Sequence, residues 1–396
     1  MKPYPQSLVA LIIVFVLFEG IVVTQTDFLR RSYWGDESHI IATIRSFGDD
    51  MSLKAIGDYR EVTPPLVYIV YALWGRLVGF DLPALRLLSL VFAFAVYLIF
   101  HRLLFELFGV GLTAFLAAAF LMVNPYMIGT SVFVFTDMMT MAFVAALVWA
   151  VFHERPLVFF FSAAGALLCR QYAVFLVLAA GTYFLVRMIV RVGRSPAVMI
   201  GAAVAAVIPL VSLCALWKGI APPSGLAYWN PGGGFVYHWD YVSVYVAMSV
   251  VYCFPFVLLT WKKFYTDRRL LTYSLAGGLF YLAFPITPSK VTLEQTSHIT
   301  VGLFHRAVKT LLPISAVEHA FFLVLFILGI TVLACIVRDG WMRMKQGDAT
   351  FALFLDISVV FFYLVMPFSY QNWEKYLLPL LPIFFMRLLM FRREVV

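Results

Sequence analysis

The chain has 396 residues, of which 63% are hydrophobic and only 13% are charged, and its formal net charge is +8. A soluble domain carries about a quarter charged residues, so this chain has too little polar surface to cover a water-soluble globule. Long apolar runs recur from end to end, which predicts an all-α protein that crosses a membrane several times. The basic residues lie between these runs instead of along one stripe, so we expect membrane lipids, and no nucleic acid, as partners.

A membrane-spanning helix needs about 20 apolar residues. By this measure the sequence predicts about twelve spans, with approximate cores at 7–24, 83–101, 111–125, 137–152, 157–169, 171–188, 196–217, 242–261, 270–285, 319–337, 351–367 and 376–391. The fifth span is short, and we expect a break after it at Arg170. No separate soluble segment interrupts the pattern, so 1–396 is expected to be one integral-membrane domain.

The distribution of lysine and arginine predicts the orientation. With the N-terminus in the cytoplasm, more than half of the 29 basic residues fall in short cytoplasmic loops and ends, which is the usual bias. Both termini are then cytoplasmic, and three long segments, 25–82, 218–241 and 286–318, face the other side. We therefore expect the functional surface on the non-cytoplasmic side of a bacterial or archaeal plasma membrane or of the endoplasmic reticulum.

The first of these long segments carries the most information. It contains the run Trp-Gly-Asp-Glu-Ser-His at 34–39, so two adjacent carboxylates lie close to the predicted membrane surface. A short amphipathic stretch follows at 40–47. Prolines at 64 and 65 then precede an apolar run at 66–80, which suits a helix N-terminus lying at the interface.

Two interpretations of the acidic pair stay open. Asp36 and Glu37 are well placed to cap a helix that begins near Ser38, because acidic residues favour first turns. Ionisable residues held at a membrane surface also cost free energy, which makes them functional candidates.

A first span followed by this acidic pair, then Thr-Pro-Pro-Leu at 63–66 and Arg86 at the start of the second span, resembles the GT-C superfamily of integral-membrane glycosyltransferases. These enzymes take sugars from polyprenyl-phosphate carriers. The resemblance implies a GT-C-like helical bundle with amphipathic helices in the first extracytoplasmic segment.

Further segments, in the same order over nearly the whole chain, resemble the DIE2-type alpha-1,2-glucosyltransferases, which add the last glucose to the dolichol-linked oligosaccharide. The similar segments are Phe135-Thr136-Asp137, Cys169-Arg170-Gln171, 216–220 with Tyr237-His238, 295–309 with Ser297-His298 and His305-Arg306, and 375–379. The chain departs from that family at His39, which comes one residue early, at Ser297, which stands for an arginine, and at Asp137, which stands for a glutamate. The resemblance to the superfamily is therefore closer than that to the glucosyltransferase branch.

The resemblance implies an inverting transfer of a hexose, in the first place glucose, from a polyprenyl (dolichyl) phosphate to a glycan or lipid-linked acceptor. Asp36 is expected to be the general base that takes the proton of the acceptor hydroxyl, and Glu37 to orient the acceptor or support Asp36. The leaving phosphate requires positive charge. The substrate-binding candidates are His39, Asp137, Arg170, Gln171, His298, Arg306, Lys309 and Lys375. No metal and no cofactor is expected.

Several of these residues have simpler interpretations. Arg170 can extend toward the interface, Asp137 can cap a helix, and Arg306, Lys309 and His298 can belong to a solvated loop. Two other functions also compete: an enzyme of the same superfamily that uses carrier-linked mannose or arabinose, and a multi-pass transporter. Transporters tend to show related halves and broken helices at the midplane, whereas the polar residues here lie at the predicted outer ends.

Overall fold

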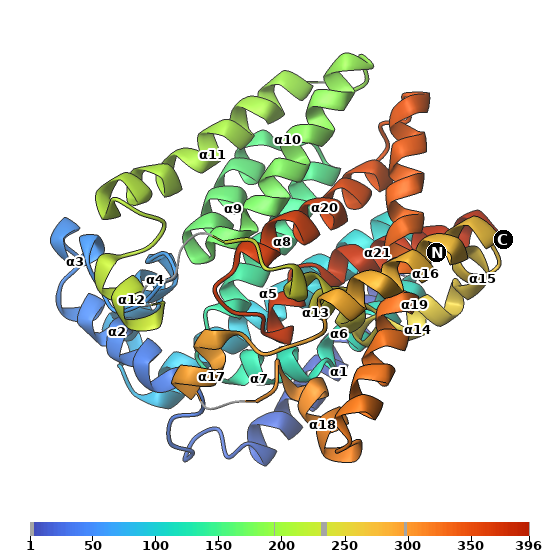
Figure 1. Cartoon of the computed structure of the whole chain (residues 1–396). Helices are drawn as coiled ribbons and strands as arrows, with labels where there is room; N and C mark the ends of the chain where they lie inside the picture. The colour runs from blue at the N-terminus through green and yellow to red at the C-terminus, as the bar shows by residue number, and fades with distance from the viewer. Residues whose placement is uncertain (1–3, 194, 231–235, 297–298, 396) are drawn as a thin grey trace. The chain divides into compact units, whose positions relative to one another are not determined.

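The structure, a computed structural model, describes residues 4–193, 195–230, 236–296 and 299–395. Every regular element in these ranges is a helix (Figure 1). The chain divides into two compact units. The first unit comprises 1–173 and 201–231, and the second comprises 174–200 and 232–396.

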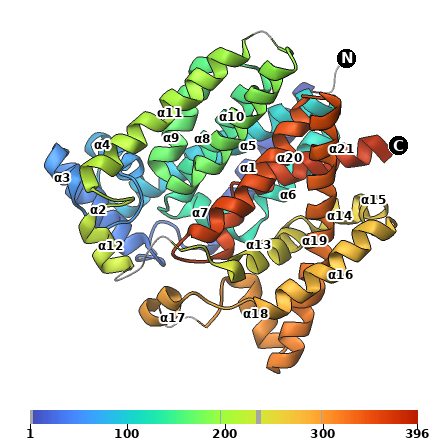
Figure 2. The same ribbon diagram turned by 45° about the horizontal axis from the view of Figure 1, so that its top comes forward.

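The first unit holds the N-terminal helices. They are α1 (Tyr4–Gln25), α2 (Glu37–Asp49), α3 (Leu53–Gly57), α4 (Leu66–Val78), α5 (Leu82–Phe108), α6 (Gly111–Met122), α7 (Pro125–Val132), α8 (Asp137–Phe152), α9 (Pro156–Cys169), η1 (Gln171–Ala173), most of α11 (Pro196–Trp217), and α12 (Pro223–Trp229). The long α5 packs on α6 and α8. α8 packs on α9, and the two helices lie side by side in both views (Figures 1 and 2). The short α2 packs on α4.

The second unit holds the remaining helices. They are α10 (Val174–Ile189), α13 (Trp239–Tyr252), α14 (Phe254–Leu259), α15 (Trp261–Tyr265), α16 (Arg268–Ala283), α17 (Lys290–Thr296), α18 (Leu303–Leu311), α19 (Ser315–Gln346), α20 (Phe351–Val365), η2 (Met366–Phe368), η3 (Glu374–Leu377) and α21 (Leu381–Val395). Here α19 packs on α13, α16 and α20, and α10 packs on α20.

Several helices have the length and composition of membrane spans. Among the described residues six qualify, or seven if the bent pair of α6 and α7 counts as one span. The six are Tyr4–Gln25, Leu82–Phe108, Gln171–Ile189, Pro196–Trp217, Ser315–Gln346 and Phe351–Phe368. Each overlaps a predicted span, so the chain has the helices of a multi-pass membrane protein. The expected number of about twelve is not confirmed.

The difference in number comes from short and broken helices. α8, α9 and α21 have 16, 14 and 15 residues. At a rise of 1.5 Å per residue they reach only about 21–24 Å, which is less than the hydrocarbon core of about 30 Å. The predicted span 242–261 breaks between α13 and α14, where Pro255 lies in the first turn of the new helix. Pro125 likewise begins α7, which is bent by 73° from α6.

The polar contacts of the first unit gather at two opposite ends of its long helices. At one end Glu106, in the last turn of α5, pairs with His153 at the end of α8, with 2.7 Å between Oε2 and Nε2. At the other end Arg86 lies in the first turns of α5, and Asp137, which begins α8, meets Arg170 at the end of α9. The 20 residues from Arg86 to Glu106 span about 30 Å of helix, similar to a bilayer core. We call the end with Arg86 the site end.

Candidate functional site

The amphipathic pattern of α2 determines which acid of the pair is buried. Its buried residues are Glu37, Ile40, Ile41, Thr43, Ile44 and Phe47. Because Glu37 stands three, four and seven positions before the three isoleucines, it lies on the same helical face. Asp36 precedes the helix and stays outside this face, with 52% of its side chain exposed.

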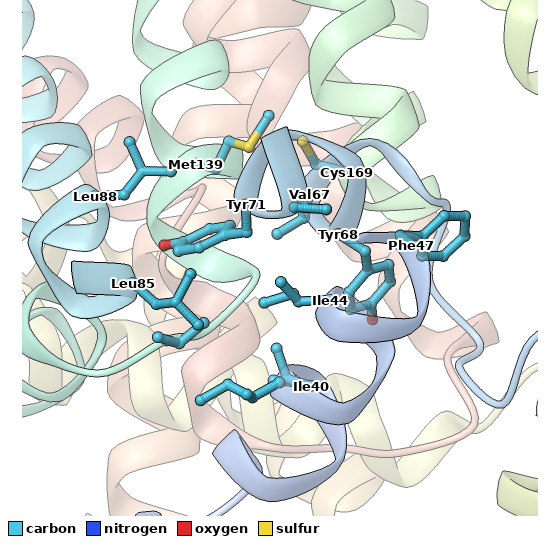
Figure 3. Close-up of a cluster of buried hydrophobic side chains, with 13 residues drawn as sticks. Ile40, Ile44, Phe47, Val67, Tyr68, Tyr71, Leu85, Leu88, Met139 and Cys169 are labelled. Carbon is cyan, nitrogen blue, oxygen red and sulfur yellow. The ribbon is translucent and has the colours of Figure 1, made fainter. Parts of the chain in front are cut away.

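The apolar side of α2 enters a cluster that supports the site end. Figure 3 shows side chains from α2, α4 and α5 pointing toward one another, together with Met139 of α8 and Cys169 at the end of α9. Ile44, Tyr71 and Leu85 are completely buried there. Full burial of such a side chain contributes about 1.5–3 kcal/mol. The cluster therefore fixes α2 and α4 on the ends of the longer helices.

Glu37 forms a buried ion pair with Arg86. The Nη2 of Arg86 donates to Oε2 of Glu37 at 2.7 Å, and its Nε donates to Oε1 at 3.0 Å. The other N–H groups of Arg86 donate to the backbone carbonyls of Phe28, Arg31 and Ser32 at 2.6–3.2 Å. All five donors of the guanidinium are thus used. Arg86 ties the segment after α1 to the start of α5.

The remaining capacity of the Glu37 carboxylate is also used. The backbone N–H of Val134 donates to Oε1 and that of Trp34 donates to Oε2, both at 2.9 Å. A carboxylate offers about four acceptor positions, and four hydrogen bonds occupy them here. The two roles expected for Glu37, orientation of an acceptor or support of Asp36, both stay predictions.

Asp36 lies directly beside this anchor. The helix begins at Glu37, close to the start expected from the sequence, and Asp36 occupies the capping position, but its side chain makes no capping hydrogen bond. Its Oδ1 lies 3.9 Å from Nε2 of His39. The half-exposed carboxylate is accessible and faces a nitrogen of an imidazole ring.

His39 lies between two carboxylates. Its Nδ1 is 2.8 Å from Oε1 of Glu61, a residue that is 5% exposed. Thr43, one turn after His39 on α2, donates to the same Glu61 oxygen at 3.3 Å. The indole of Trp229 covers the imidazole, with ring centroids 4.9 Å apart. Neighbours from three segments of the first unit thus fix the ring of His39.

The electrostatics of this group favour a charged imidazole. Burial lowers the pKa of His39, but its contacts with Asp36 and Glu61 outweigh burial and raise the pKa to about 9. At neutral pH the ring is therefore protonated and carries a positive charge between the two carboxylates.

The second long segment of the sequence packs on the first. Ser224 of α12 donates through its backbone N–H and its hydroxyl to the two carboxylate oxygens of Asp58, at 2.9 and 2.8 Å. The indole of Trp217 donates to the carbonyl of Ile56 at 2.9 Å. The part of the chain from 217 to 224 thus packs on 56–58. The side of a membrane on which each long segment lies stays a prediction.

Arg170 and Gln171 lie at the site end but differ in their contacts. The Nη2 of Arg170 donates to Oδ1 of Asp137 at 3.2 Å, and both residues are buried. Asp137 begins α8 as expected, without a capping hydrogen bond from the preceding residue. The amide of Gln171 donates to the carbonyls of Val62 at 2.6 Å and Ile220 at 3.2 Å. Gln171 thus joins the two long segments, and Arg170 does not extend toward solvent.

The other cationic candidates belong to the second unit. Arg306 is exposed and Lys309 half-buried on α18, where Nζ of Lys309 donates to the carbonyl of Ile299 at 3.4 Å. Lys375 is half-buried in η3. His298 lies outside the described residues. A role of these residues in binding phosphate stays a prediction.

The neighbouring Glu374 caps the start of α18. Its Oε1 accepts from the backbone N–H of His305 at 2.7 Å, and its Oε2 accepts from that of Phe304 at 3.0 Å and from the hydroxyl of Tyr252 at 2.6 Å. A carboxylate at this position satisfies N–H groups that have no partner within the helix. Glu374 therefore stabilises the N-terminus of α18.

His305 is held in one neutral form. The backbone N–H of Val301 donates to its Nδ1 at 3.0 Å, so the ring proton resides on Nε2, which is 2.6 Å from Oε1 of Glu318. Burial lowers the pKa of His305 despite the neighbouring carboxylate. A second ring proton is disfavoured because it meets the N–H of Val301.

Sequence reasoning missed Glu61. It is 22 positions away from His39, so no helical or strand spacing connects the two residues. The only signal is an ionisable residue shortly before the Thr-Pro-Pro run in the same segment. Among the described residues no group of three or more His, Cys, Asp or Glu side chains is arranged to hold a metal ion.

A comparison with protein-family models finds no match to this chain, and searches of curated proteins and of solved structures find none either. The resemblance to the GT-C superfamily therefore stays an expectation from the residues quoted above.

Proposed function

We propose that the chain is a glycosyltransferase that moves a hexose from a polyprenyl phosphate to a glycan or lipid-linked acceptor. The observation that carries the proposal is the division of the acidic pair. Glu37 is completely buried with every acceptor position used, whereas the adjacent Asp36 is half-exposed beside a cation. A reactive carboxylate needs this combination of a fixed position and access to substrate.

In the proposed reaction the acceptor hydroxyl gives its proton to Asp36. The acceptor oxygen attacks the anomeric carbon, and the bond from this carbon to the phosphate oxygen breaks. The bonding electrons leave with the polyprenyl phosphate, so the anomeric configuration inverts. A positioned base contributes about 10²- to 10⁴-fold to such a step. The phosphate is already a good leaving group, so the proposal requires neither a strong general acid nor a metal.

Several basic residues are candidates for stabilising the negative charge of the leaving phosphate. Arg170 is the candidate at the site end, where it shares its charge with Asp137. A phosphate that displaced Asp137 from this pair would gain a charge-assisted hydrogen bond. Arg306, Lys309 and Lys375 remain candidates of the second unit.

The test uses the purified full-length protein in nanodiscs with a panel of polyprenyl-phosphate hexoses and measures the released polyprenyl phosphate. We expect turnover with at least one donor, and a fall of about 10²- to 10⁴-fold in Asp36→Asn. Asp49→Asn is the matched control, because Asp49 is an exposed carboxylate at the other end of α2. Near-normal turnover in Asp36→Asn would refute the role of this carboxylate. The same panel distinguishes glucose from carrier-linked mannose or arabinose.

One observation favours a transporter as the second candidate. The helix α7, which follows the break at Pro125, contacts a buried acid of α1: the hydroxyl of Ser131 donates to Glu19 at 3.0 Å. Broken helices beside buried ionisable groups are common in transporters. Flux of a soluble solute into proteoliposomes, abolished by Glu19→Gln and not by Asp36→Asn, would favour this candidate.

A further inference from the structure

Glu61, His39 and Asp36 form a linear array that the proposed reaction does not yet use. The array runs from the buried carboxylate of Glu61, through the two ring nitrogens of His39, to the half-exposed carboxylate of Asp36. The first distance, 2.8 Å, is a hydrogen bond, and the second, 3.9 Å, is a close approach of two opposite charges. The inference drawn from this array rests on the proposed function.

In-line transfer places the base and the leaving phosphate on opposite sides of the reaction. A base is about 2.6–3.2 Å from the acceptor oxygen, which is about 3–3.5 Å from the anomeric carbon before attack. The leaving oxygen lies on the far side of that carbon, on the order of 6 Å or more from the base. Nε2 of His39 is 3.9 Å from Oδ1 of Asp36, so this ring is assigned to the base and not to the phosphate.

We propose that Glu61 and His39 are positioning residues for Asp36. Glu61 accepts from Nδ1 of His39 and fixes the orientation of the ring. The Nε2–H of the imidazolium then faces Asp36 and favours its ionised form, which is the form that accepts a proton. After the transfer, the proton leaves Asp36 through the exposed side of the carboxylate to water, and His39 keeps both of its protons.

The neighbours of Glu61 and His39 are consistent with these positioning roles. Thr43 donates to the same oxygen of Glu61, which fixes the buried carboxylate from a second direction. The phenols of the half-buried Tyr59 and the buried Tyr68 also interact with Glu61, and both are neutral. The indole of Trp229, which does not titrate, packs against the ring of His39.

The kinetic test compares Glu61→Gln, His39→Gln and the double variant in the donor assay. We expect each single variant to lower kcat by about 10- to 100-fold, the range for removing a carboxylate that orients a functional histidine, with KM for the donor within about threefold. Because Glu61 acts through His39, the double variant is expected to be no slower than His39→Gln. Asp49→Asn is again the control and is expected to keep kcat within about threefold, because this exposed carboxylate lies at the other end of α2 and outside the array. Losses that multiply in the double variant would overturn the proposal.

A second measurement does not depend on activity. The pKa of the His39 ring is followed by NMR of the histidine ring signals, with His39→Gln to assign them. In the wild-type protein the pKa is expected at about 9, and in Glu61→Gln it is expected to fall toward the ordinary value of about 6.5. An unchanged pKa in a folded variant would overturn the proposed array. If the pKa falls but no donor supports turnover, the array stands and the proposed function fails.

Discussion

Replacement of Arg86 by methionine gives the most direct test of how the site end is held together. The substitution removes the buried partner of Glu37 and the donors to three backbone carbonyls. Breaking a buried pair by removing one partner costs about 3–5 kcal/mol, because the remaining charge stays buried without compensation. We expect α2 and the segment before it to open while the long helices stay folded.

The rate at which a thiol reagent modifies Cys169 measures this opening. It is completely buried in the cluster to which α2 and α4 contribute, so opening of these helices is expected to expose its thiol to a reagent (Figure 3). The other cysteines, Cys214, Cys253 and Cys335, are first replaced by alanine so that one thiol reports. A loss of 3–5 kcal/mol raises the modification rate about 100-fold to a few thousand-fold, at tenfold per 1.4 kcal/mol.

The control is the double substitution Glu37→Met and Arg86→Met, which leaves no buried charge. It still removes the acceptor of two backbone N–H groups, each worth about 1 kcal/mol. We expect Cys169 to be modified more slowly in the double variant than in Arg86→Met. Unchanged protection in Arg86→Met, or a double variant that opens more than both single variants together, would refute the role of the ion pair.

Three further predictions concern stability. The first concerns His39, whose pKa is raised to about 9, so that its protonated ring stabilises the fold fully below about pH 6.5 and loses this effect as the pH rises through 9. The melting temperature of the wild-type protein should therefore fall over this interval, and that of His39→Gln should fall less. The second is that Gly225→Ala lowers the stability of the fold by about 1–3 kcal/mol, because the added Cβ would lie 2.2 Å from the carbonyl oxygen of Glu61. Gly219→Ala is the control, since its Cβ would meet nothing closer than 3.8 Å, and the denaturation midpoints of the two variants test the prediction. Glu19→Met should leave the melting temperature unchanged or raise it, because an apolar side chain avoids burying a carboxyl group, and a large decrease would indicate a bound partner of Glu19.

Local sequence signals predicted those features that depend on a few neighbouring residues. The two prolines at 64 and 65 precede the start of α4 at Leu66, and α9 ends at Cys169, directly before the expected break at Arg170. The span Pro196–Trp217 has the predicted bounds. Hydrophobicity and helix-terminal residues act over one or two turns, so they can be read from the chain.

The number of spans and the roles of the two acids depend on tertiary contacts. The predicted span 111–125 ends at Met122 as α6, because Asn124 caps a new helix and Pro125 begins it in another direction. Hydrophobicity is the same on both sides of such a break, so a count of apolar runs does not detect it. The contacts of Glu37 with Arg86 and of His39 with Glu61 join residues 49 and 22 positions apart, and no spacing rule reaches that far.

The difference in burial between Asp36 and Glu37 follows from the position at which α2 begins. Consecutive residues at a helix start point in directions about 100° apart, so one of two adjacent side chains can face the interior while the other faces solvent. The isoleucine face of α2 turns Glu37 inward to Arg86, and this leaves Asp36 outward next to His39. Under the proposed function, the buried acid supplies the rigidity that the exposed base needs, and a Glu37 variant that folds should impair turnover only by loosening Asp36. The apolar face of α2 thus determines which acid of the pair is buried and which is exposed.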